Sequence, residues 1–330
     1  MPLEALLHQR GEYEGRRNAI ITSTMGLFDF LRYLRLKFLI SSLRLLVRLL
    51  VPLPAPKPDS VLRIPSRDKG RTIKIHVYNP SGVARSAGGE PYPVLINFYG
   101  SGFALQYHGA DDRFCRFVAT HSSHVVLDVQ YRVAPENPFP AAVNDAEDAV
   151  QYLLGHPDKY QTSHVSLCGF SSGGTLALVT STLFPRGTFE SLIGFYPSPS
   201  MAGDPGERKA PVPGRERPSF WTKVFREAYI RGKDARDPRI SPAFADTTNF
   251  PQEMLIFTAD HDVSATDMEA LAERIKKEGH ASGRNIVVRR MEDCDHGFDK
   301  NKKRENQMEA GREAYAQVAD FLKSLESKIG

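Results

Sequence analysis

The stretch SLCGFSSGGTL, residues 166–176, places two adjacent serines among small residues, between an apolar segment and a helix-forming one. The spacing of Gly169, Ser171 and Gly173 is typical of a sharp strand-to-helix turn that presents its central serine. Glycine suits both flanking positions because side chains there would collide with the tight turn. The stretch therefore predicts Ser171 as a nucleophile. The other interpretation is a small-residue linker without chemistry.

Around this turn, the chain alternates short apolar segments with amphipathic helical ones. Several apolar segments are unbroken, which is typical of strands covered on both faces. Helical spacing of apolar residues marks residues 268–275 and 315–325. This alternation predicts an α/β fold with a mostly parallel central sheet and helices on both faces. The expected strands begin at Thr72, Pro93, His124, His164, Ser191, Glu253 and Asn285.

Residues 1–60 read as an N-terminal helical segment with a proline-rich connector, and residues 61–330 as the catalytic domain. Residues 27–51 are rich in leucine and phenylalanine but interrupted by basic residues, so no uncharged run approaches the roughly 20 residues that span a bilayer. Two interpretations stay open for this segment. It is either a lid over the catalytic domain or a basic amphipathic helix that lies on a membrane surface.

Residues 200–236 interrupt the alternation with a loop rich in glycine, proline and charge, followed by an aromatic helix that carries Trp221 and Phe225. An insertion after a core strand is a usual place for a cap over a substrate site. We expect a helical cap here. The alternative is a surface segment without a role in substrate binding, whose aromatic side chains simply pack on the core.

A serine nucleophile needs a base, an orienting acid and donors for the oxyanion. Asp260 and Asp262 follow one expected strand, and His296 follows the next one. These positions are at the carboxyl ends of strands, where open α/β sheets place their active sites. The loop in INFYGSGFAL, residues 96–105, can turn its N–H groups toward a substrate oxygen, although a glycine-rich turn without a ligand would look similar.

The order of these motifs resembles that of the hormone-sensitive-lipase-like esterases, the α/β-hydrolase fold-3 group. The similarity covers about residues 90–325 and implies an α/β-hydrolase fold with a helical cap. The matching motifs are YGSGF (99–103), YRVAPENPFPAAVNDAEDAV (131–150), GFSSGG (169–174), DPRISP (237–242) and DHGF (295–298).

Carried over by position, the resemblance implies that Ser171 is the nucleophile and His296 the general base. Asp262 becomes the orienting acid, with Asp260 as the alternative. Backbone N–H groups of Ser101, Gly102 and Ser172 become the oxyanion donors, and we expect Phe103, Trp221 and Phe225 to contact the substrate.

Three residues depart from the family pattern. Tyr99 replaces the usual histidine of the oxyanion loop, and Ser101 replaces its middle glycine. Phe170 stands where the family usually has an acidic residue, so we expect an electrostatic contact to be lost there. Because the oxyanion donors are backbone groups, these changes affect the substrate range more than the type of reaction.

The function expected from this resemblance is that of a serine carboxylic-ester hydrolase, which forms an acyl-enzyme with small to medium acyl esters. This chemistry requires no metal and no cofactor. An acyltransferase or a lactone hydrolase would use the same triad. A third hypothesis is a non-enzymatic small-molecule receptor on the same fold. Such receptors have normally lost a triad residue.

Charge and cysteine content narrow the choice of partner and compartment. The net charge of +4 comes from 43 basic and 39 acidic residues without a basic stripe, so a nucleic-acid partner is not expected. The three cysteines are widely spaced, so we expect buried reduced thiols. Reduced thiols favour a cytoplasmic protein. A peripheral membrane contact through residues 27–51 stays open. The oligomeric state, including a homo-oligomer, stays open.

Overall fold

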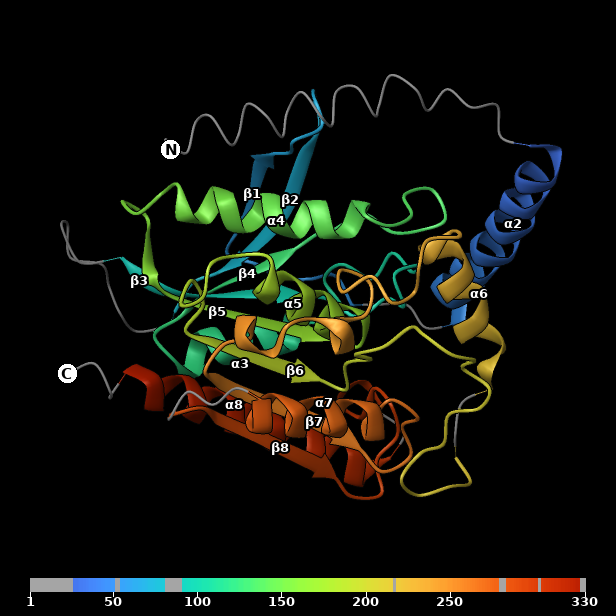
Figure 1. Ribbon diagram of the computed structural model, residues 1–330. Coiled ribbons are helices and arrows are strands. Elements are labelled where there is room, and N and C mark those ends of the chain that lie inside the picture. The colour runs from blue at the N-terminus through green and yellow to red at the C-terminus, as the bar shows by residue number, and fades with distance from the viewer. Residues whose placement is uncertain are drawn as a thin grey trace.

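The computed structural model describes residues 26–50, 54–80, 91–215, 218–278, 283–301 and 304–326. One eight-stranded sheet runs through the molecule in the order β1-β2-β4-β3-β5-β6-β7-β8 (Figure 1). The strands are β1 Ser60–Pro65, β2 Thr72–Tyr78, β3 Tyr92–Phe98, β4 Val125–Val129, β5 Tyr160–Phe170, β6 Ser191–Phe195, β7 Glu253–Ala259 and β8 Asn285–Met291.

The sheet is parallel from β4 to β8, while β1 and β2 pair antiparallel at one edge. This confirms the mostly parallel sheet that the alternating pattern predicts. All seven expected strands are present, and β1 is an additional one. The pattern does not predict β1, because this short edge strand has mostly exposed side chains and lacks an unbroken apolar run.

Helices cover both faces of the sheet, as predicted. Helices α4, α5 and α7 pack with one set of strand side chains, and α3 and α8 pack with the other, so two apolar layers sandwich the sheet. The helices are α2 Leu27–Leu50, α3 Asp112–His121, α4 Ala141–Leu154, α5 Ser172–Thr182, α6 Ser219–Ile230, α7 Ala265–Glu278 and α8 Glu305–Glu326.

Helices α2 and α6 lie beside each other at one end of the molecule, outside the two layers that cover the sheet (Figure 1). Of the segments expected to form the lid and cap, residues 1–25, 51–53 and 216–217 lie outside the described residues. Among the described helices, none combines the length and the apolar character that crossing a bilayer requires.

The turn between β5 and α5 shows why glycine flanks the serine pair. Ser171 has φ 52° and ψ −119°, and its N–H donates to the carbonyl oxygen of Phe195 on the neighbouring strand at 2.8 Å. A Cβ atom on Gly169 would lie 2.2 Å from the carbonyl oxygen of Gly173. A Cβ atom on Gly173 would lie 1.9 Å from the carbonyl oxygen of Phe98, at the end of β3. The start of α5 therefore touches the backbone of β3 directly.

Substitution of Gly173 tests this contact. We expect Gly173→Ala to lower the free energy of unfolding by about 3 kcal/mol or more, because backbone atoms cannot move aside as the end of a side chain can. Gly155→Ala is the matched control, since a Cβ atom there would meet its nearest neighbour at an ordinary 3.4 Å. Urea unfolding of the two variants measures the difference, and equal stability would contradict the account.

Candidate active site

Three side chains from separate loops form one hydrogen-bonded chain beside the turn. The Ser171 hydroxyl lies 2.8 Å from Nε2 of His296, and Nδ1 of His296 lies 2.7 Å from Oδ2 of Asp262. These distances fit a neutral imidazole that donates to the carboxylate and accepts from the serine. The carboxylate is buried, whereas Ser171 and His296 are partly exposed and accessible to a ligand.

Of the two aspartates that the sequence left open, Asp262 is the one beside the histidine. Its second oxygen, Oδ1, accepts the N–H of Ser264 at 2.9 Å, which fixes the orientation of the carboxylate. Asp260 instead accepts the N–H of Asp293 at 2.9 Å and braces the loop after β8. The two carboxylates therefore hold different parts of the same region.

The loop after β3 brings a second set of groups to the turn. The N–H of Ser101 donates to the hydroxyl of Ser172 at 2.9 Å, and the two hydroxyl oxygens are 3.2 Å apart. Thus one of the expected oxyanion donors already has an acceptor. The N–H groups of Gly102 and Ser172 have no acceptor among the described residues. The sequence motif predicts a role for the backbone of Ser172 but not for its hydroxyl.

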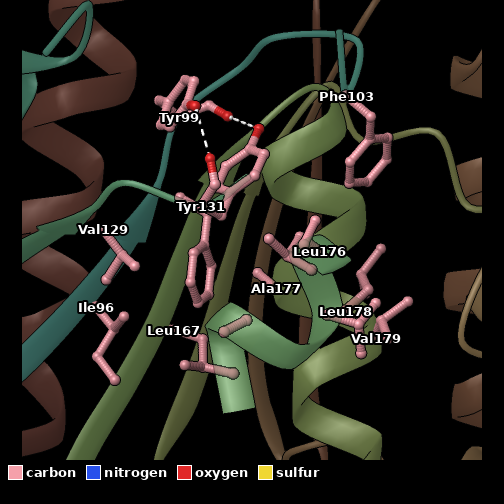
Figure 2. Packing of buried hydrophobic residues seen from close by; sticks show 14 of the residues in the cluster. Ile96, Tyr99, Phe103, Val129, Tyr131, Leu167, Leu176, Ala177, Leu178 and Val179 are labelled. Carbon is pink, nitrogen blue, oxygen red and sulfur yellow. Dashed lines mark hydrogen bonds between the residues drawn. The ribbon is translucent and has the colours of Figure 1, made fainter. Parts of the chain in front are cut away.

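Two tyrosines anchor this loop to the segment after β4. The Tyr131 hydroxyl donates to the carbonyl oxygen of Tyr99 at 2.6 Å, and the Tyr99 hydroxyl donates to the carbonyl oxygen of Tyr131 at 3.1 Å (Figure 2). The rings stack with centroids 4.4 Å apart. Burial raises the pKa of both phenols, which therefore stay protonated donors. Tyr99, which replaces the family histidine, thus holds the loop by reciprocal hydrogen bonds.

The Tyr131 hydroxyl also links this anchor to the serines, because it lies 2.8 Å from the hydroxyl of Ser101. Tyr131 was not among the predicted site residues. The signal that could have found it is its place at the start of the YRVAPE motif, directly after the strand that follows the oxyanion loop.

Phe170 requires a correction. The sequence predicts the loss of an electrostatic contact at this position, but Nζ of Lys300 lies 4.0 Å from the centroid of the Phe170 ring. The same ammonium group pairs with Asp111 at 2.9 Å and with Asp299. The quadrupole of an aromatic ring gives its face a partial negative charge, which attracts the ammonium group. A cation–π contact therefore exists where the family usually has a carboxylate.

The three predicted substrate-contacting aromatics lie in different environments. Phe225 is half-buried and covers the oxyanion loop, since a Cβ atom on Gly102 would lie 2.6 Å from its ring. Trp221 lies one turn earlier on α6, with its ring centroid 6.0 Å from that of Phe225. Phe103 is only 2% exposed and stacks on Tyr229 at 3.9 Å, so its contact with a substrate stays a prediction.

The comparison with protein families adds an independent observation. A family model described as the alpha/beta hydrolase fold matches residues 95–300, which include the oxyanion loop, the serine turn and both partners of the serine. The chain belongs to the α/β-hydrolase family. This confirms the predicted fold and the resemblance to the fold-3 group.

Several relatives of this α/β-hydrolase are named as esterases. The carboxylic ester hydrolase LipN of Mycobacterium tuberculosis is 28% identical over 238 residues, which cover 66% of this chain and 60% of that protein, less than two thirds of its length. The carboxylesterase NlhH of the same species is 27% identical over 238 residues, or 66% of this chain and 71% of that protein.

Two solved structures of similar shape carry the same kind of name. An esterase from the archaeon Pyrobaculum calidifontis superposes with a TM-score of 0.72 at 29% identity, over 88% of this chain and 94% of that one. A thermostable carboxylesterase cloned from a metagenomic library has a TM-score of 0.70 at 26% identity, over 87% and 97% of the two chains. These names agree with the enzyme class predicted from the sequence.

Proposed function

We propose that this α/β-hydrolase is a serine carboxylic-ester hydrolase that works through an acyl-enzyme. The observation that carries the proposal is the continuous hydrogen-bonded chain from Ser171 through His296 to Asp262. The names of the relatives support the same class of reaction.

In the proposed mechanism, Ser171 attacks the acyl carbon while Nε2 of His296 takes its proton and passes it to the leaving alcohol. Asp262 keeps the imidazole in the accepting tautomer and stabilises the imidazolium that forms. Water, activated by the same histidine, then attacks the acyl-enzyme and releases the acid. Ser171 is the residue that becomes acylated.

The oxyanion that forms during both steps needs donors. The N–H groups of Gly102 and Ser172 meet no acceptor in the described part of the chain and can donate to the substrate, and α5 begins at Ser172, so its N-terminus favours negative charge there. The N–H of Ser101 becomes a third donor when the substrate oxygen replaces the Ser172 hydroxyl as its acceptor. Phe225 and Trp221 form the apolar wall on the cap side and accommodate small to medium acyl groups.

Substitution of the nucleophile is the experiment that tests the proposed function. We expect Ser171→Ala to remove turnover of short p-nitrophenyl esters, with kcat lowered by about 10⁴-fold or more, because no acyl-enzyme can form. The circular dichroism spectrum should stay that of the native fold. Full activity in this variant would overturn the mechanism.

The two aspartates provide a matched pair for the same test. Asp262→Asn leaves the shape of the site but stabilises the wrong imidazole tautomer, so kcat should fall by about 10⁴-fold. Asp260→Asn removes a carboxylate of the same loop that braces Asp293, and it should retain most of the activity. The reverse order would assign the orienting role to Asp260.

The Ser172 hydroxyl competes with the substrate for the N–H of Ser101, so its removal should help catalysis. The hydrogen bond from the Ser101 N–H to the Ser172 hydroxyl is neutral, and such a bond contributes about 1 kcal/mol. If Ser172→Ala removes this competing bond, kcat/KM should rise by about fivefold. Ser101→Ala keeps the competing bond, because that bond uses the backbone N–H, and it should show no rise. A tenfold fall for Ser172→Ala would show that the hydroxyl supports the oxyanion site instead.

We further propose that α2 and α6 together form the cap over this site. Arg32 and Arg35 of α2 both pair with Glu227 of α6 at 2.6 Å. Arg44 of α2 donates to the carbonyl oxygens of Ala104 and Ala134, next to the oxyanion loop. These contacts support the lid interpretation of residues 27–51, because they connect α2 both to α6 and to the oxyanion loop.

The outer face of α2 supports a peripheral membrane contact as well. Only Leu36 and Ile40 of this helix are buried, and Lys37 and Arg48 share its exposed surface. Many exposed apolar side chains on one helix, together with basic ones, mark a surface that binds apolar material. The exposed large apolar residues of α2 are Leu27, Phe28, Phe30, Leu31, Leu34, Phe38, Leu45, Leu46, Leu49 and Leu50.

Sedimentation with vesicles of phosphatidylcholine and phosphatidylserine tests this contact. We expect the native chain to sediment with the vesicles and the double variant Phe28→Glu/Phe38→Glu to stay in the supernatant, because it places two acidic groups among these apolar side chains. Val61→Glu is the control, since Val61 is an exposed apolar residue on β1 rather than on α2. A native chain that stays in the supernatant would leave α2 with the lid role alone.

A further inference from the structure

A second group of polar side chains, which the proposed ester hydrolysis does not use, lies at the antiparallel side of the sheet. We call it the His–Asp cluster, and it consists of His76, His108 and Asp128. His76 on β2 and Asp128 on β4 are paired across the ladder, so their side chains emerge side by side. His108 reaches the same point from the segment that connects the oxyanion loop to α3.

The three side chains converge with atoms that can bind a metal. Nε2 of His108 lies 3.3 Å from Oδ2 of Asp128, and Nδ1 of His76 lies 3.9 Å from the same oxygen. All three atoms lie within 4.8 Å of one another. Ligands of a tetrahedral zinc ion, at bonds of about 2.0–2.1 Å, are themselves separated by about 3.3 Å. A small inward movement of the three side chains would therefore place their donor atoms at three corners of a tetrahedron around an ion.

Two of these atoms have no hydrogen-bond partner among the described residues although they are buried. They are Nδ1 of His76 and Oδ2 of Asp128, whose residues are only 2% and 0% exposed. Their separation of 3.9 Å is too long for a hydrogen bond between them. Since buried polar atoms in native proteins almost always have a partner, the unpartnered Nδ1 of His76 points to a bound species between it and Asp128, whose carboxylate also faces the backbone N–H of Gly109.

The surroundings hold the carboxylate in place for such a ligand. Asn97 donates to the other oxygen of Asp128, Oδ1, at 2.9 Å and to Asp111 at 3.2 Å, which leaves Oδ2 turned toward the histidines. A hydrogen bond from outside the ligand set is the usual way in which a metal-binding carboxylate is oriented.

One imidazole of the His–Asp cluster already makes a hydrogen bond that metal binding must replace. Nε2 of His108 lies 3.0 Å from the main-chain oxygen of Asp128. Coordination requires the His108 proton to move to Nδ1, and the bond to the ion replaces that hydrogen bond.

We propose that the His–Asp cluster binds one divalent transition-metal ion, and that zinc is the ion its donors favour. Two imidazoles and one carboxylate are typical zinc ligands, whereas magnesium and calcium prefer oxygen ligands alone. The ion would tie together β2, β4 and the segment that follows the oxyanion loop. Its role is structural, because no step of ester hydrolysis passes through the cluster.

The cluster also contacts the anchor of the oxyanion loop. The ring of His108 lies 5.7 Å from that of Tyr99, between centroids, and Tyr99 forms the reciprocal bonds with Tyr131. An ion that immobilises His108 would therefore restrict the position of Tyr99. We expect metal binding to raise the thermal stability of the chain first, with any effect on activity being secondary.

Metal titration of the full chain tests the proposal. The protein is stripped with EDTA, dialysed, and titrated with Co²⁺, whose visible absorption reports imidazole ligands and low coordination number. Zn²⁺ is then added as a competitor. We expect one Co²⁺ per chain, loss of the visible bands on addition of one equivalent of Zn²⁺, and a rise in Tm of at least about 2–4 °C with excess Zn²⁺.

The variants His76→Ala and Asp128→Asn should each weaken binding by at least about tenfold. His121→Ala is the control, because it removes an exposed histidine at the end of α3 and should bind as the native chain does. Native affinity in both cluster variants would overturn the proposal. A native Co²⁺ spectrum identical to that of the hydrated ion would also overturn it, and that result needs no variant.

Discussion

The direct backbone contact between the end of β3 and the first turn of α5 is the constraint on which the site depends. Gly173 has no room for a side chain beneath the carbonyl oxygen of Phe98. Because of this approach, the chain must turn sharply at Ser171, which adopts a positive φ and carries its hydroxyl to His296. The same approach brings the oxyanion loop to the serines, so that the N–H of Ser101 meets the hydroxyl of Ser172. One packing contact therefore sets the positions of the nucleophile and of the groups around it.

Buried polar contacts then hold the loops that this packing brings together. The reciprocal bonds of Tyr99 and Tyr131 fix the oxyanion loop to the segment after β4, and the N–H of Ser264 fixes the carboxylate of Asp262. Such bonds are directional, so they hold a loop in one geometry where apolar packing alone would allow several. The proposed mechanism needs this rigidity, since a catalytic group displaced by about 1 Å loses much of its effect.

The sequence predicts the fold and the serine turn well, because both depend on local patterns. Unbroken apolar runs mark the strands, and the spacing around Ser171 marks the turn. The choice between Asp260 and Asp262 depends on which carboxylate faces a distant histidine, and residue spacing alone left both open. The hydroxyl of Ser172 and the cation over Phe170 were missed because their partners are distant in the chain. The His–Asp cluster has no spacing signature either, since its members come from two strands and a connecting segment.

Labelling with a fluorophosphonate tests the central claim, that Ser171 is the activated nucleophile of this chain. The measurement is the mass of the intact protein after reaction, followed by peptide mapping of the turn between β5 and α5. The account predicts one adduct per chain on Ser171, and no adduct in Ser171→Ala. An unlabelled native chain, or an adduct located on Ser172, would contradict it.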